Sequence, residues 1–263
     1  MDEQSVPQPH WEVHDGTGPY LLLIHGFLSS GAQWLPNIEA LGDVCRPVTL
    51  ELYGHGRSPS PVALTPYQTP RYAEAIDDIR DQLDVDSWFV CGYSLGAAVS
   101  IRYALDYPHR IRGHIFTNSA SAFSERRLGD AWRANARASA ERIRVGGKAA
   151  LERIAVHPKR AKRLPADVYE ALVADAERID PAGIANAMES MMPTASVRDD
   201  LRHNSKPALL VCGRFEKRFA PHRAHAEAVM PHLEVVDVDS GHAVNMAAAD
   251  AFNAHVAAFI SAH

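Results

Sequence analysis

Three features that often define the class of a protein are scarce or absent in this sequence of 263 residues. It contains only three cysteines, and an odd number of cysteines cannot form a complete set of disulfide bonds. No apolar run approaches the roughly 20 residues that a membrane-spanning helix needs. The cysteine and histidine spacing typical of zinc sites is also lacking. We therefore expect reduced, buried thiols, with Cys91 and Cys212 in apolar runs, and neither a metal nor a membrane partner.

Positive charge is not in excess either, because the formal net charge of the chain is -5. This balance argues against nonspecific binding to nucleic acids. The first nine residues are polar and lack the basic and apolar regions of a signal peptide, so we expect a cytoplasmic protein. With 46% hydrophobic and 22% charged residues, the chain can form a packed core. Its length suits one α/β domain with an insertion and leaves the oligomeric state open.

The stretch between residues 88 and 107 carries the clearest pattern of the chain. Trp88–Cys91 is an apolar run of strand length, and Ala97–Tyr107 has the apolar spacing of a helix. Between them lies Gly-Tyr-Ser-Leu-Gly, with Ser94 at its centre. A serine between two glycines on a strand-to-helix turn resembles the nucleophile elbow of α/β-hydrolases. The motif alone also fits a plain glycine-rich turn, but the flanking strand and helix favour the elbow.

Each residue of this elbow has an expected role. Gly92 and Gly96 lack side chains, which would collide with neighbouring backbone in so sharp a turn. The turn would raise the hydroxyl group of Ser94 above the sheet as a nucleophile. It would also place the backbone N–H of Leu95 at the start of a helix, where it can face an oxyanion. We further expect Tyr93 to contact the substrate.

A second glycine motif, His-Gly-Phe, follows an early apolar strand. In α/β-hydrolases such a turn supplies the second N–H of the oxyanion hole, so the resemblance implies this role for the backbone of Phe27. For the side chain of His25 we favour a structural role. The loop Gly-His-Gly-Arg-Ser at 54–58 also recurs in this fold class, and we expect His55 to hold its structure.

The catalytic partners of the serine are expected after the last two apolar strands, 207–212 and 233–238. His242 follows the final strand and would act as the general base. Glu216 follows the preceding strand and would orient the imidazole and stabilise its positive charge. The order serine, acid, histidine is the chain order of α/β-hydrolases. The alternative candidates for the acid are Asp237, Asp239 and Glu125.

The alternation of strands and helices stops between residues 119 and 204, where helix-like segments rich in alanine and arginine occur. We interpret residues 1–118 and 205–263 as an α/β-hydrolase core, a mostly parallel sheet with helices on both faces. Residues 119–204 would form a helical cap inserted after the sixth strand.

The charge of this cap segment is uneven. Residues 126–163 include twelve Lys or Arg residues and three acidic ones, a net charge of +9. One interpretation is that solvated helix faces pair with one another. The other is a basic lid that collects a substrate bearing a carboxylate. The candidate substrate contacts in this segment are Arg126, Arg127 and Trp132.

Together these motifs resemble the α/β-hydrolase superfamily over essentially the whole chain. Within it, the chain is similar to the menaquinone-pathway synthases that eliminate pyruvate to give 2-succinyl-6-hydroxy-2,4-cyclohexadiene-1-carboxylate. The similarity lies in residues 25–27, 92–96, 126–127 and 212–219. The chain differs in having Glu216 where that family has aspartate, and alanines where it has an arginine soon after the elbow. The resemblance therefore implies the fold and the catalytic triad but not the substrate.

These residues predict an enzyme that cleaves a carboxylic ester, lactone or similar acyl bond of a small molecule through an acyl-enzyme on Ser94. The predicted mechanism requires neither a metal nor an organic cofactor. One alternative is elimination or carbon–carbon bond hydrolysis on a dicarboxylate, as in the synthases. Another is a non-catalytic receptor that uses the same pocket, and the intact set of catalytic residues argues against it.

Overall fold

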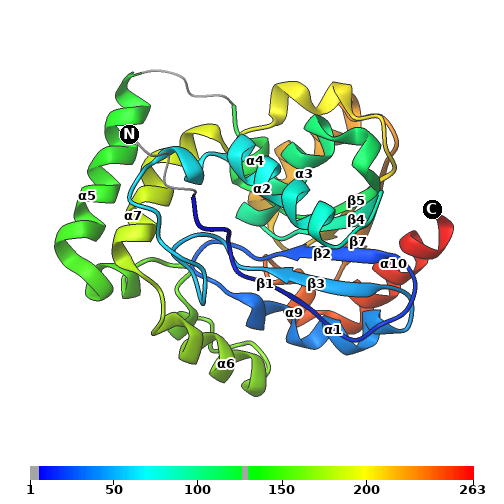
Figure 1. Ribbon diagram of the computed structural model, residues 1–263, viewed down its shortest axis with the longest axis horizontal. Coiled ribbons are helices and arrows are strands. Elements are labelled where there is room, and N and C mark those ends of the chain that lie inside the picture. The colour runs from blue at the N-terminus through cyan, green and yellow to red at the C-terminus, as the bar shows by residue number, and fades with distance from the viewer. Residues whose placement is uncertain (1–5, 126–129) are drawn as a thin grey trace.

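A seven-stranded sheet forms the centre of the molecule (Figure 1). The structure is a computed structural model that describes residues 6–125 and 130–263. Neighbouring strands are parallel, except that β1 is antiparallel to β3, so the predicted mostly parallel sheet is confirmed. In sheet order the strands are β1 (Trp11–Val13), β3 (Arg46–Leu50), β2 (Tyr20–Ile24), β4 (Trp88–Gly92), β5 (Ile111–Thr117), β6 (Ala208–Gly213) and β7 (Leu233–Val238).

Helices cover both faces of this sheet, which parallel strands require because both of their faces are apolar. On one face α2 packs against α3, and on the other α1 packs against α10 (Figure 1). Alternate residues of β2 enter the two hydrophobic cores, Leu22 on the side of α2 and α3, and Leu21 and Leu23 on the side of α10. The covering helices are α1 (Leu35–Gly42), α2 (Thr69–Gln82), α3 (Leu95–Asp106), α8 (Ala220–Val229), α9 (Val244–Ala247) and α10 (Ala249–Ala262).

Between β5 and β6 the described residues form helices and no strand. Figure 1 shows α5, α6 and α7 together beyond one end of the sheet. α5 bends at Gly147, whose φ of 54° lies outside the helical region. This helical segment follows β5, the fifth strand of the described chain, so its expected position after a sixth strand is wrong. Within residues 6–125, one short strand, β1, precedes β2. Its helices are α4 (Ala120–Phe123), α5 (Asp130–Glu152), α6 (Ala166–Ala176) and α7 (Pro181–Ser190).

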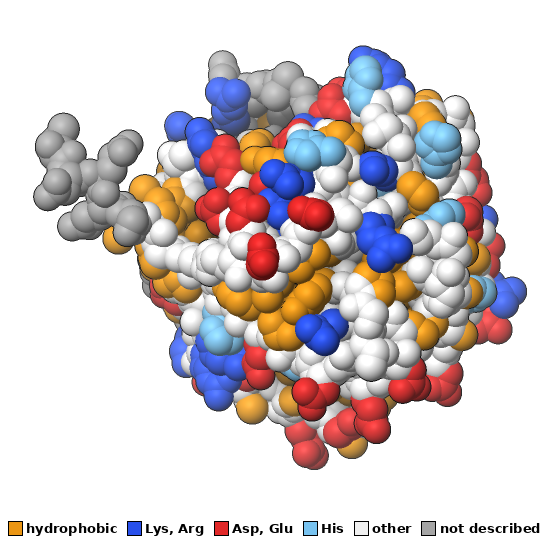
Figure 2. All heavy atoms as spheres, turned by 45° about the vertical axis from the view of Figure 1, so that its right-hand side comes forward, with side chains coloured by type: hydrophobic (Ala, Val, Ile, Leu, Met, Phe, Trp, Pro, Cys, Tyr) orange, Lys and Arg blue, Asp and Glu red, His pale blue; other side chains and the backbone are white. Residues whose placement is uncertain are grey.

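In the part of the chain that the structure describes, seven short 3-10 helices join these elements: η1 (Gly31–Trp34), η2 (Thr65–Tyr67), η3 (Pro108–Arg110), η4 (Pro158–Arg160), η5 (Met192–Thr194), η6 (Arg198–His203) and η7 (Lys217–Phe219). Within the described ranges, no helix is both long and apolar enough to cross a bilayer. The three cysteines are buried and unpaired, as expected. On the face shown in Figure 2, basic side chains are interspersed with acidic ones, and hydrophobic patches lie between them.

Candidate active site

Ser94 lies on the turn between β4 and α3 in a conformation that an L-residue rarely adopts. Its φ is 52° and its ψ is -111°. The two flanking glycines permit this turn. A Cβ atom on Gly92 would lie 2.6 Å from the Cα of Ala97, and one on Gly96 would lie 2.5 Å from the carbonyl oxygen of His25. The strained serine therefore depends on the absence of both side chains.

The side chains of Ser94, His242 and Glu216 form a continuous line of hydrogen bonds. The Nε2 atom of His242 lies 2.9 Å from the Oγ of Ser94, and its Nδ1 atom lies 2.9 Å from the Oε2 of Glu216. The carboxylate also accepts a 2.8 Å hydrogen bond from the side-chain amide of Asn118. Burial by itself would raise the pKa of Glu216, but the hydrogen bonds from His242 and Asn118 outweigh it, and the pKa lies below its usual value.

The three alternative acids point elsewhere within the described part of the chain. Asp237 forms an ion pair with Arg223 at 2.5 Å, and Asp239 forms one with Arg214. Glu125 lines a separate cavity. Glu216 is therefore the carboxylate that meets the imidazole.

Two backbone N–H groups near the serine lack an acceptor within the described residues, those of Phe27 and Leu95. Their neighbours are satisfied. The N–H of Gly26 donates to the Oε1 of Gln33 at 3.1 Å, and the N–H of Leu28 donates to the Nε2 of His55 at 3.1 Å. Leu95 is the first residue of α3, where the helix dipole favours negative charge. This arrangement can accept the oxyanion of a tetrahedral intermediate.

Two buried histidines hold the loop that carries Phe27. The Nε2 of His25 accepts a hydrogen bond from the N–H of Leu52 at 3.0 Å, and the Nε2 of His55 accepts the one from Leu28. Burial lowers the pKa to about 4 for His25 and to about 3 for His55. Both rings are therefore neutral acceptors near pH 7, which agrees with the structural roles expected from the sequence.

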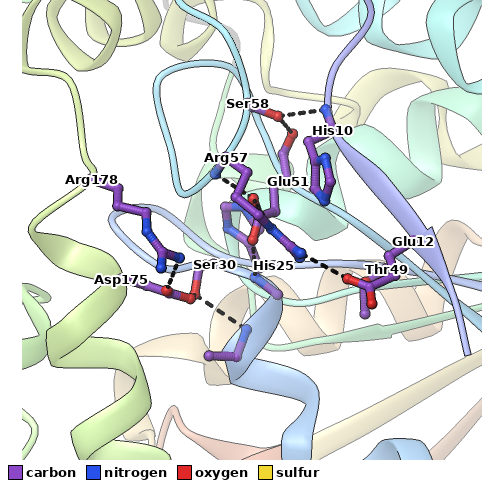
Figure 3. A network of polar contacts seen from close by, with 12 residues as sticks. His10, Glu12, His25, Ser30, Thr49, Glu51, Arg57, Ser58, Asp175 and Arg178 are labelled. Carbon is purple, nitrogen blue, oxygen red and sulfur yellow. Dashed lines mark hydrogen bonds and ion pairs between the residues drawn. The ribbon is translucent and has the colours of Figure 1, made fainter.

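A polar network extends from this loop to α6, in the helical segment between β5 and β6 (Figure 3). The buried carboxylate of Glu51 accepts hydrogen bonds from the N–H groups of Gly31, at 3.2 Å, and Arg57, at 2.5 Å. Next to it, the hydroxyl group of Ser30 donates to the carboxylate of Asp175 in α6 at 2.6 Å. The loop of the predicted oxyanion hole is thus tied both to the core and to a helix of the inserted segment.

A cavity of about 190 Å³ lies over Ser94 and His242. Its lining is largely apolar. Five of the lining residues come from the segment between β5 and β6: Val156, Pro158, Ala161, Leu164 and Leu172. Tyr93 also lines it and contacts the ring of His242 edge-on, with ring centroids 5.3 Å apart. Within the described residues, no group of three or more His, Cys, Asp or Glu side chains is arranged to hold a metal ion.

The other predicted substrate contacts lie away from this cavity or outside the described residues. Trp132 lines a different cavity of about 570 Å³, together with Arg198 and His222. Arg126 and Arg127 fall in the range that the structure does not describe.

Two residues of the site were not anticipated from the sequence. Asn118 follows β5 directly and holds Glu216, and its oxygen accepts a hydrogen bond from the N–H of Gly213 at 3.1 Å. Its position at the carboxyl end of a central strand was a usable signal, since ligands bind at that edge in α/β sheets. Gln33, which holds Gly26, had no distinguishing signal in the sequence.

Comparison with known proteins agrees with this architecture. The family model described as alpha/beta hydrolase fold matches residues 19–249. A putative 2-succinyl-6-hydroxy-2,4-cyclohexadiene-1-carboxylate synthase from Bacillus subtilis (strain 168) is 24% identical over 255 residues, covering 92% of this chain and 90% of that protein.

Solved structures show the same fold. MenH from S. aureus has a TM-score of 0.82 at 20% identity and covers 96% of this chain and 98% of its own. The enol-lactonase from Burkholderia xenovorans LB400 has a TM-score of 0.78 at 22% identity and covers 96% of both chains. The family match spans most of the sequence, and the sheet and its helices have the corresponding arrangement. This chain therefore belongs to the α/β-hydrolase family.

Proposed function

We propose that this protein is a serine hydrolase that cleaves a carboxylic ester, lactone or similar acyl bond of a small molecule. The observation that carries the proposal is the line Ser94–His242–Glu216, with 2.9 Å at both hydrogen bonds. The two N–H groups without an acceptor, on Phe27 and Leu95, lie beside that line. The family of this chain includes enzymes with such chemistry, among them the enol-lactonase of similar fold.

The mechanism follows from these positions. His242 takes the proton of the Ser94 hydroxyl group through Nε2 while Oγ attacks the carbonyl carbon. The N–H groups of Phe27 and Leu95 stabilise the oxyanion, and Glu216 stabilises the imidazolium. His242 then gives the proton to the leaving group. A water molecule then attacks the acyl-enzyme in the same way, with His242 as the base, which releases the carboxylic acid and frees Ser94.

We also propose that the helical segment 119–204 is a cap over the site. Five of its residues line the cavity above Ser94, and Ser30 joins the core to α6 through Asp175. A larger cavity of about 810 Å³ adjoins Phe27 and runs along α5. Arg142 and Arg153 line it without a carboxylate partner among the described residues. Glu141 also lines this cavity, but it is paired with Arg144 at 3.9 Å. The two arginines therefore support a substrate with a negative charge.

A second candidate function is elimination on a dicarboxylate, which the similarity to the Bacillus subtilis synthase favours. Against it, Ala97 and Ala98 occupy the start of α3 and are fully buried, so this part of the helix offers no cation to a carboxylate. A panel of acyl esters, lactones and dicarboxylates, measured with the same enzyme preparation, separates the two functions.

The direct test of the proposal is covalent labelling. A fluorophosphonate should form a bond between phosphorus and the Oγ of Ser94, with loss of fluoride, and mass spectrometry should locate the adduct on the peptide that contains Ser94. The Ser94→Ala variant should remain unlabelled and should lack turnover of every ester in the panel. Labelling at another residue, or turnover by Ser94→Ala, would contradict the proposal.

A further inference from the structure

Four buried amide side chains connect the loop of the oxyanion hole to the helices that follow His242. They come from four different elements: Gln33 from η1, Asn37 from α1, Asn245 from α9 and Asn253 from α10. Gln33, Asn37 and Asn245 are fully buried, and Asn253 is 8% exposed. A core at this place needs no polar side chains for its packing, and buried amides are costly unless they are paired.

One end of this amide chain holds the backbone next to Phe27. The Oε1 of Gln33 accepts a hydrogen bond from the N–H of Gly26 at 3.1 Å. The Nε2 of Gln33 donates to the Oδ1 of Asn245 at 3.4 Å, and the Nδ2 of Asn245 donates to the carbonyl oxygen of Gln33 at 3.1 Å. Gln33 also lines the cavity over Ser94.

The other end anchors the segment after His242. The Nδ2 of Asn245 also donates to the Oδ1 of Asn37 at 3.0 Å. The Nδ2 of Asn37 returns a bond to the carbonyl oxygen of Asn245 at 2.9 Å and reaches the Oδ1 of Asn253 at 2.8 Å. All four side-chain oxygens therefore accept a hydrogen bond, and all four amide nitrogens donate one, the last from Asn253 to the carbonyl oxygen of Pro36.

We propose that Gln33 and Asn245 are positioning residues, which fix the oxyanion N–H of Phe27 relative to the imidazole of His242. Phe27 directly follows the N–H that Gln33 holds, and Asn245 lies three residues after His242. Neither side chain hydrogen-bonds to Ser94 or His242, so each acts through the backbone that it holds. A chain of amides in which every side-chain oxygen and nitrogen has a partner has few alternative arrangements and holds the attached backbone in place. The inference rests on the proposed serine chemistry.

The physical consequence concerns rate more than binding. A displacement of about 1 Å between reacting groups can lower a rate by about 100-fold, and an oxyanion donor acts mainly in the transition state. Removal of the Gln33 amide frees the N–H of Gly26 and lets the loop relax. We therefore expect turnover to fall while the KM for a neutral ester changes little.

The test compares Gln33→Met and Asn245→Ala with the unmodified enzyme. The first readout is the second-order rate of fluorophosphonate labelling at Ser94, which needs no knowledge of the natural substrate. The second is kcat and KM for a short neutral ester. We expect labelling and kcat to fall about 10- to 100-fold in either variant that folds, with KM within about 3-fold of normal.

A matched control separates positioning from stability. Asn204 is another buried amide, 4% exposed, which binds His114 and the carbonyl oxygens of Lys206 and Pro231 near the amino ends of β6 and β7. Asn204→Ala should lower the Tm about as much as Gln33→Met and Asn245→Ala do, and should leave the labelling rate within about 2-fold of that of the unmodified enzyme. If Gln33→Met reacts as fast as the unmodified enzyme, or no slower than Asn204→Ala, the inference is wrong. Failure of the unmodified enzyme to label at Ser94 would instead overturn the proposed function.

Discussion

At the scale of single residues, the site depends on how two side chains share the imidazole of His242. Its Nε2 faces the hydroxyl group of Ser94, and its Nδ1 faces Glu216, which is in turn held by Asn118. In the proposed mechanism, the carboxylate sets the tautomer in which Nε2 is free to accept the serine proton. The contact from Asn118 lowers the mobility of the acid and favours its ionised form.

The role of Glu216 predicts a graded loss of turnover. Glu216→Gln removes the charge and should lower kcat by up to about 10⁴-fold, because the imidazolium loses its partner. Glu216→Asp shortens the side chain by one methylene group and should keep part of the activity. The controls Asp237→Asn, Asp239→Asn and Glu125→Gln should stay near normal. If Glu216→Gln kept near-normal turnover while one control variant lost its turnover, the residue changed in that control would be the acid of the triad.

The lowered pKa of Glu216 predicts how its contribution to stability varies with pH. The carboxyl group binds its proton more weakly in the folded state, so its contribution is present above the unfolded pKa of about 4.5 and is lost as pH falls through the folded pKa. The difference in the free energy of unfolding between the unmodified enzyme and Glu216→Gln should therefore shrink below about pH 4.5. Chemical denaturation at several pH values measures it, and a constant difference would argue against the lowered pKa.

The buried histidines predict that the free energy of unfolding begins to fall at a higher pH than the contribution of Glu216 does. Burial lowers the pKa of His25 to about 4, whereas an unfolded histidine titrates at about 6.5. Between these values the unfolded chain binds a proton that the folded chain does not, so stability falls as pH falls, by up to about 3 kcal/mol for His25. His25→Gln should show a shallower pH dependence of the free energy of unfolding below pH 6.5, and the two slopes should agree above pH 7. Equal slopes throughout would contradict the neutral buried ring.

At the scale of elements, the turn between β4 and α3 determines where Ser94, the proposed nucleophile, lies. The strand is buried at every residue and fixes one side of the turn, and the first turn of α3 fixes the other. The loop after β2 passes so close that a side chain on Gly96 would meet the backbone of His25. Ser94 and the loop that carries Phe27 are thus packed as one unit.

This packing predicts a large effect of a single methyl group. Gly96→Ala should lower the free energy of unfolding by about 1–3 kcal/mol or more, because the neighbouring backbone must shift. Gly241→Ala is the matched control, since a Cβ atom there would meet nothing within 4 Å. Thermal unfolding of both variants measures the difference. Equal Tm values would show that the contact at Gly96 is relieved easily.

At the scale of the whole molecule, an excess of positive charge is concentrated in residues 126–163, although the chain has a net charge of -5. Part of this charge is neutralised, because Arg144 pairs with Glu189 at 2.8 Å and Lys148 pairs with Glu177 at 3.3 Å. Such pairing is the first of the two interpretations of the basic segment. Arg142 and Arg153, beside the cavity of about 810 Å³, support the second interpretation, a basic lid that collects a substrate bearing a carboxylate.

The remaining positive charge predicts a salt-dependent preference for anionic substrates. Screening acts over about 10 Å at 0.1 M salt, so kcat/KM for a carboxylated ester should fall with salt more steeply than for a matched neutral ester. Arg142→Gln with Arg153→Gln should remove most of this difference. Arg133→Gln, an exposed change on the same helix, should retain it. If the two esters respond alike in the unmodified enzyme, the basic segment is only a solvated surface.

The sequence alone determined the features that depend on short stretches of chain. Apolar runs specified β2, β4 and β6, and the glycines around Ser94 specified the elbow, because strand burial and turn sterics act between near neighbours. The order of serine, acid and histidine along the chain indicated the family. From the lack of excess basic charge and of long apolar runs we predicted neither nonspecific nucleic-acid binding nor a membrane-spanning helix.

Only the tertiary structure decided which distant side chains meet. The order of the motifs predicted that His242 meets Ser94, 148 positions away, but nothing in the sequence predicted that Asn245 meets Gln33, 212 positions away. The choice of Glu216 over Asp237 and the separation of Trp132 from the cavity over Ser94 depend on strand order and on the direction of each side chain. Local sequence patterns do not specify these contacts, because a hydrogen bond between remote elements forms only after the sheet has brought the elements together.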